Sequence, residues 1–86
     1  MESRIEFDQY VPGEGLKFRW DDGFALDVTI HGSEVLLRGN PAGLTSLARH
    51  LLTLAQESVH TGSHLHLTGG SELDGDADLV IERADL

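Results

Sequence analysis

The segment from Gly39 to Gly62 constrains the fold most, because it is the one stretch with sustained helical periodicity. Asn40 is a preferred N-cap residue, and Pro41 suits the first helical position, where its missing N–H costs nothing. Gly62 is the type of residue expected just beyond a last turn. Apolar residues recur at the spacings of one helix face: Leu44, Leu47, Ala48, Leu51, Leu52, Ala55 and Val59. We predict a helix from Asn40 to Val59 with this leucine face buried.

Gly43 is unusual so early in a helix, where glycine loses about 1 kcal/mol relative to alanine. Close approach of the helix to a sheet would explain it. The alternative is a glycine-rich phosphate loop, but the Walker lysine and the G-x-G-x-x-G spacing are both absent. We therefore expect a tight packing contact at Gly43.

The rest of the chain alternates apolar and polar residues, as half-buried strands do. These stretches cover residues 4–8, 16–20, 24–31, 63–68 and 77–83, with one more after the turn at 32–33. We predict an α+β fold with an antiparallel sheet of about five to six strands. The order is a β-meander, the helix packed on one face of the sheet, and two closing strands. We expect a single domain over residues 1–86, since a second core would leave each half close to the roughly 40-residue minimum.

Two turns set the registers of the meander. A three-residue loop at Asp21–Gly23, with Gly23 left-handed, pairs Trp20 with Phe24, whereas a two-residue loop would mix apolar and charged residues on one face.

The second turn, Gly32–Ser33, has glycine first, which is typical of type II′. It pairs Ile30 with Val35 and Val28 with Leu37 on the inner face, and the outer face then aligns Lys17, Asp27 and Arg38 and sets His31 opposite Glu34.

The charge excludes several classes of partner. The formal net charge is −9 and the pI is near 4.7, so the chain lacks the basic patch that nucleic acids or anionic membranes require. There are no cysteines, which fits a reducing compartment, and no long apolar segment or secretion signal is seen. We expect a cytoplasmic protein whose acidic surface either serves solubility or attracts a basic partner.

His64 and His66 form an H-x-H pair on one face of a predicted strand, which is compatible with two ligands of one metal ion. A third ligand would come from a neighbouring strand, for example Glu82 or Asp78. No further ligand spacing supports the pair, so the sequence predicts neither a metal site nor a cofactor.

A run of alternating carboxylates lies between the last two predicted strands, in a connection that we expect to be flexible: Glu72, Asp74, Asp76 and Asp78. It departs from a calcium loop, because the sixth position counted from Asp74 is Leu79 rather than glycine and the twelfth is Asp85 rather than glutamate. The remaining readings are a solvated loop and a docking site for a basic partner.

Groups for catalysis are scarce, since the chain has no cysteine and no nucleophile motif such as G-x-S-x-G. We predict no enzymatic activity. The outer sheet face instead combines the two histidines with Leu36 and Val80, a mixture typical of protein-binding patches. An ordinary solvated sheet face and a homodimer contact are the alternatives.

Three motifs occur together: G-N-P-A-G-L-T-S-L-A-R-H-L-L-T-L-A from Gly39, G-S-H-L-H-L-T from Gly62, and D-L-V-I-E from Asp78. They resemble the immunity protein 32 family of bacterial polymorphic-toxin systems, in which a G-N-x-x-G-L-x-x-L-A helix precedes a histidine-bearing strand and an L-x-I-E-type strand. The resemblance implies a small cytoplasmic protein that binds and neutralises a toxin domain, with no catalytic residues to carry over.

We therefore expect a non-enzymatic protein-binding module, a monomer or weak homodimer, whose partner is a protein such as a basic toxin domain. The candidate contact residues are His64, His66, Glu72, Asp74, Asp76, Asp78, Leu36 and Val80. The alternatives are a stand-alone metal- or ligand-binding domain that uses His64 and His66, and a structural homodimer.

Overall fold

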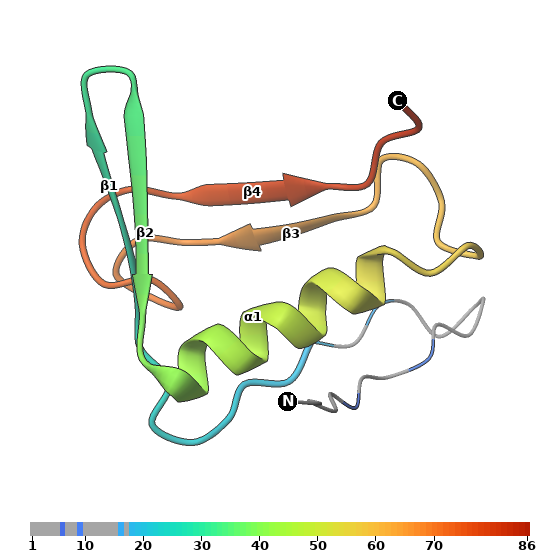
Figure 1. The fold of residues 1–86 in the computed structure, drawn as a ribbon, viewed down its shortest axis with the longest axis horizontal. Coiled ribbons are helices and arrows are strands. Elements are labelled where there is room, and N and C mark those ends of the chain that lie inside the picture. The colour runs from blue at the N-terminus through green and yellow to red at the C-terminus, as the bar shows by residue number, and fades with distance from the viewer. Residues whose placement is uncertain (1–5, 7–8, 10–15, 17) are drawn as a thin grey trace, which may run out of the picture.

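A computed structural model describes residues 6, 9, 16 and 18–86. Over these residues the fold is α+β, with one helix and antiparallel strands in two small sheets (Figure 1). The elements are β1 (Leu26–His31), β2 (Glu34–Gly39), α1 (Pro41–Leu54), β3 (His64–Leu67) and β4 (Leu79–Glu82). The α+β class is confirmed. The prediction of one sheet of five to six strands is wrong, because the described residues form two separate pairs, β1–β2 and β3–β4.

The predicted strand at 16–20 is absent from the described residues of that stretch, which belong to no strand. Phe18 and Trp20 instead pack against His50 of α1, with ring centroids 5.0 and 4.4 Å away. The Asp21 N–H donates to Ser46 Oγ at 2.9 Å. Residues 18–21 therefore pack against α1 and do not pair with β1. Lys17 and most of the predicted strand at 4–8 lie outside the described residues.

The Gly32–Ser33 turn is confirmed, whereas the Asp21–Gly23 loop turns the chain without joining a pair of strands. Gly23 and Gly32 have φ angles of 76° and 60°, the left-handed region that these turns need. Trp20 stacks on Phe24 with centroids 4.6 Å apart, although no strand pairing joins them. In the β1–β2 hairpin, Ile30 pairs with Val35, and the remaining register follows as predicted, Val28↔Leu37, Asp27↔Arg38 and His31↔Glu34.

The helix begins as predicted. The Asn40 Oδ1 accepts from the Gly43 N–H at 2.8 Å and from the Ala25 N–H at 3.0 Å, while Nδ2 donates to the Gly23 carbonyl at 2.8 Å. One side chain thus caps α1 and joins it to the chain entering β1. A Cβ at Gly43 would collide with the Ala25 carbonyl oxygen, so the close approach expected there is confirmed.

The predicted helix end is wrong: α1 stops at Leu54, well before Val59 and Gly62. The Arg83 guanidinium donates to the Leu54 and Gln56 carbonyls at 2.9 and 2.8 Å. These bonds satisfy carbonyls that a continuing helix would otherwise use. Gly62 lies instead in the turn before β3, where its N–H donates to the Arg83 carbonyl.

The prediction that the leucine face is buried holds for Leu47 but not for Leu44, Leu51 and Leu52, which are 48, 43 and 38% exposed. The helix buries a neighbouring face made of Gly43, Ser46, Leu47, His50, Thr53 and Leu54. Two hydroxyls tolerate this burial because each donates to a carbonyl one turn earlier: Ser46 to Ala42 and Thr53 to Arg49.

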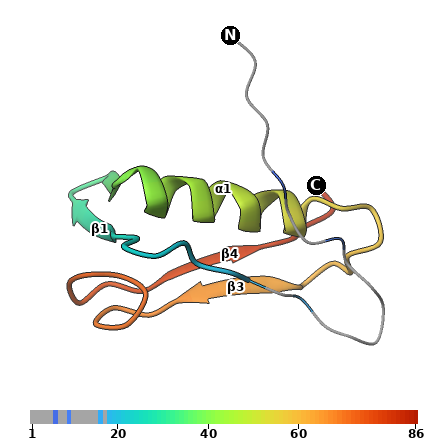
Figure 2. The ribbon, with the colours of Figure 1, turned by 90° about the horizontal axis from the view of Figure 1, so that it is seen from below.

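The core lies between α1, the β3–β4 pair and the base of the hairpin, as Figure 2 shows from below. Its buried members are Leu26, Val28, Leu47, Leu54, Leu65, Leu67 and Leu73. The hairpin crosses the end of the β3–β4 pair, and its turn projects beyond β4 (Figure 1). The inner ends of β1 and β2 are therefore held by the core, while their turn end is not.

Candidate functional site

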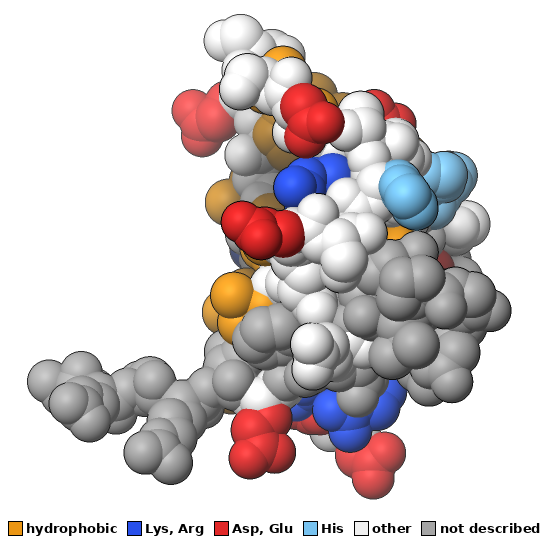
Figure 3. Space-filling model, turned by 90° about the vertical axis from the view of Figure 1, so that its right-hand side faces the viewer, with side chains coloured by type: hydrophobic (Ala, Val, Ile, Leu, Met, Phe, Trp, Pro, Cys, Tyr) orange, Lys and Arg blue, Asp and Glu red, His pale blue; other side chains and the backbone are white. Residues whose placement is uncertain are grey.

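The outer face of the β3–β4 pair carries three of the predicted contact residues. His66 pairs directly with Val80, and His64 pairs with Glu82, so all four side chains lie on the face turned away from the core. Val80 is 53% exposed, and histidine side chains reach the surface in Figure 3. Leu65 and Leu67 alternate with the histidines and fill the core. The strand period alone thus explains why the H-x-H pair is accessible.

Asp78 is the link between this face and the loop before β4. Its Oδ2 lies 3.1 Å from His66 Nε2, and its Oδ1 accepts from the Gly69 N–H at 2.8 Å. The Gly69 N–H and then His66 hold the pKa of Asp78 below its ordinary value. The Asp78 carboxylate, at the end of the loop, is therefore bonded to Gly69 at its start.

Glu72 is engaged in the same way. Its two carboxylate oxygens accept from the Thr68 N–H at 3.0 Å and from the Ser71 hydroxyl at 2.8 Å. These donors, the Thr68 N–H first, lower the pKa of Glu72. Leu73 beside it is fully buried. The prediction of a flexible connection is therefore wrong, because this loop is anchored by a core leucine and two bonded carboxylates.

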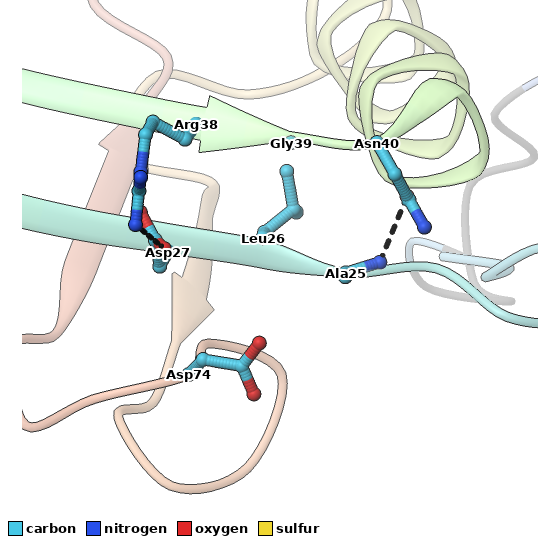
Figure 4. A pocket seen from close by; sticks show the side chains of 7 residues that line it. All are labelled: Ala25, Leu26, Asp27, Arg38, Gly39, Asn40 and Asp74. Atoms are coloured by element: carbon cyan, nitrogen blue, oxygen red, sulfur yellow. Dashed lines mark hydrogen bonds and ion pairs between the residues drawn. The ribbon is translucent and has the colours of Figure 1, made fainter.

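Asp74 and Asp76 remain exposed on the anchored loop. The Asp74 N–H donates to the Leu26 carbonyl at 2.8 Å, which brings the loop alongside β1. A pocket of about 300 Å³ lies at this junction (Figure 4), with Asp74 on one side and the hairpin on the other. Its lining consists of Ala25, Leu26, Asp27, Arg38, Gly39, Asn40 and Asp74.

Arg38 and Asp27, which both line this pocket, form a salt bridge with each other. Arg38 donates to both Asp27 oxygens, at 3.0 and 2.7 Å, which is the fork geometry of a bidentate pair. The bond lowers the pKa of Asp27 and raises that of Arg38. Because this pair cancels its own charge, the carboxylate that gives the pocket its negative character is Asp74.

Leu36 lies on the same hairpin face as Asp27 and Arg38 and is 44% exposed. It belongs to the other sheet from Val80, so the expected single outer face that holds both residues does not exist. The structure thus joins His66 to Asp78 and brings Asp74 beside the hairpin. The predicted contact residues therefore extend over both sheets and the loop that joins β3 to β4.

A metal site would need more ligands than the histidine strand supplies. Among the described residues, no three His, Asp or Glu side chains are placed to hold one ion. Helix α1, the one helix in the described ranges, falls short of the length and continuous hydrophobicity that a bilayer crossing requires.

Sequence reasoning missed a second exposed surface by assigning its residues to the core. It consists of Ile30, Val35, Leu37, Leu44, Leu51 and Leu52, and we call it the hairpin–helix face. A signal was present, because the apolar residues of α1 span about half of its circumference, which is wider than the stripe that one packing partner needs.

The fold and its surface define a small acidic α+β protein that presents carboxylates, histidines and aliphatic side chains to solvent. Residues 34–84 match the family model described as immunity protein 32, and the chain belongs to this family. The matched residues include β2, α1, β3 and β4. No curated protein and no solved structure matches the chain.

Proposed function

We propose that the chain is a non-enzymatic immunity protein that binds a cognate toxin domain and neutralises it. The observation that carries the proposal is the family match, which covers residues 34–84. An immunity protein acts through contact with a protein partner, so it needs a presented surface rather than reacting groups. On this proposal the chain acts in the cytoplasm as a single domain.

The acidic loop supports a basic partner. The chain carries a formal net charge of −9, and Asp74 and Asp76 project from a loop that is already held in place. A preorganised loop loses little conformational freedom when a partner binds. Exposed carboxylates also attract a cationic surface and speed the encounter. The proposed contacts are the loop with Glu72 and Asp78, the β3–β4 outer face with His64, His66 and Val80, and Leu36.

The test is co-expression with candidate toxin domains, taken from the genes that flank the one encoding this chain. We expect restored growth of cells that carry the toxin, and a stoichiometric complex in size-exclusion chromatography with light scattering. An unrelated small acidic protein, expressed to the same level, is the control for nonspecific charge effects. Neither rescue nor complex with the folded protein would overturn the proposal.

A further inference from the structure

The hairpin–helix face exposes six large aliphatic side chains on neighbouring elements. Ile30 and Val35 are 64 and 62% exposed, and Leu44 and Leu51 are 48 and 43% exposed. Isolated exposed leucines are ordinary, whereas a contiguous apolar patch indicates a binding surface. In Figure 3, hydrophobic side chains lie along one side of the molecule, with acidic side chains close to them.

Gly39 shows that the two halves of this face are contiguous. It ends β2 on the same face as Leu37 and Val35, because side chains alternate along a strand. A Cβ on Gly39 would lie 3.0 Å from Leu44 Cγ and 2.7 Å from Leu26 Cδ2. The first exposed leucine of α1 therefore packs directly over the hairpin, next to its exposed aliphatic row.

From Leu44 the apolar row continues along α1 to Leu51, two turns further on, and Leu52 extends its edge. At the other end, β1 leaves the core between Val28, which is buried, and Ile30, which is exposed. Figure 1 shows why, since the turn end of the hairpin projects past β4. The face thus has two walls, one of strand and one of helix, joined at Gly39.

The charge of the molecule discriminates between possible occupants. Arg38 is paired with Asp27 at 2.7 Å, Arg49 with Asp21 at 3.2 Å, and Arg83 donates to the end of α1. These positive charges are engaged within the chain, while the net charge stays at −9. A second copy would bring the same negative charge to the interface. A cationic surface with aliphatic or aromatic side chains at its centre would meet complementary charge and complementary hydropathy.

We propose that the hairpin–helix face is the main docking surface for a cationic protein partner, which inserts an apolar projection between the hairpin and α1. This inference rests on the proposed function and identifies the toxin domain as that partner. The acidic loop then contributes to attraction, and the apolar face determines how long the complex lasts, because buried apolar anchors dominate dissociation.

The test uses as its probe the toxin domain that the co-expression experiment identifies as the partner. One variant combines Ile30→Thr with Val35→Thr, which keeps strand-forming side chains, and another combines Leu44→Gln with Leu51→Gln, which keeps helix formers. We expect each pair to raise Kd at least about tenfold, mainly through faster dissociation. Circular dichroism spectra should match those of the parent, and urea midpoints should fall only modestly, because about half of each replaced side chain is already in water.

The matched control is Leu86→Gln, which removes an exposed aliphatic side chain outside this face and should leave Kd unchanged. If the parent protein binds the toxin and the four-residue combination binds equally well, the docking surface is overturned while the immunity function stands. If the parent does not bind at all, the proposed function fails first. A dimer of the parent alone that Leu44→Gln with Leu51→Gln converts to a monomer would identify a second copy as the occupant and overturn the proposal. Affinity that is insensitive to salt would overturn the cationic character of the partner.

Discussion

At the residue scale, single side chains join elements that are distant in the sequence. Asn40 bonds the first turn of α1, the chain before β1 and the Gly23 turn at once. Arg83 ends the same helix from the opposite side. Polar contacts therefore hold the helix at both ends, and they determine where it begins and where it stops.

Gly43→Ala provides the sharpest test at this scale. Helix propensity alone predicts that alanine stabilises the helix by up to about 1 kcal/mol. The structure predicts the opposite sign, a loss of about 1–3 kcal/mol, because the new methyl group would meet the Ala25 backbone carbonyl. Urea unfolding measures the difference. Ala42→Gly is the control at the adjacent, less buried position and should destabilise by propensity alone. A stabilised Gly43→Ala variant would contradict the close approach.

At the scale of elements, α1 buries a face that mixes apolar and polar side chains and leaves part of its leucine face exposed. Leu47 is 5% exposed and Leu51 is 43% exposed, although both belong to the same repeat in the sequence. We expect Leu47→Ala to lower the free energy of unfolding by about 2–5 kcal/mol. Leu51→Ala should lower it by only about 1 kcal/mol, since much of that side chain is already in water. Equal losses in chemical denaturation would contradict the orientation of the helix.

The loop between β3 and β4 gives the fold a defined response to acid. Glu72 and Asp78 both have lowered pKa values in the folded protein. The unfolded chain therefore takes up protons more readily, so their contribution is fully present above the ordinary carboxyl pKa of about 4 and is lost as the pH falls below it. Urea unfolding across this range should show falling stability. Glu72→Gln with Asp78→Asn should reduce the slope, part of which remains because Asp27 also has a lowered pKa. An unchanged slope in the double variant would contradict the bonds of Glu72 and Asp78.

At the scale of the whole molecule, negative charge and apolar surface serve different steps of the proposed association. The charge of −9 acts over a distance of roughly 8–10 Å at ordinary salt. The hairpin–helix face acts only on contact. Charge substitutions should therefore change the association rate of the toxin complex, and substitutions in the hairpin–helix face should change its lifetime.

Reversal of two loop charges, Asp74→Lys with Asp76→Lys, should slow association with the toxin domain about tenfold and leave the fold intact. The control, Asp22→Lys with Glu57→Lys, changes the net charge equally at exposed sites outside the loop. Stopped-flow or surface-plasmon measurements at several salt concentrations separate the two. Equal slowing by both pairs would show that net charge matters and that the loop does not contact the partner.

The sequence by itself determined the parts of this protein that short-range geometry controls. The Gly23 and Gly32 turns, the β1–β2 register, the Asn40 cap and the accessible histidines of β3 follow from φ angles and from strand alternation between neighbours. These features depend on residues that are close in the chain, so the local pattern is sufficient to predict them.

Only the tertiary structure decided which surfaces the chain leaves open. The end of α1 depends on Arg83, and its buried face depends on the contact of Gly43 with Ala25. The anchored acidic loop depends on Leu73 reaching the core. Periodicity identifies apolar positions but not the partner that covers them, because burial depends on contacts between distant segments. The sequence therefore could not separate the hairpin–helix face from the core, because the leucines of both follow one pattern.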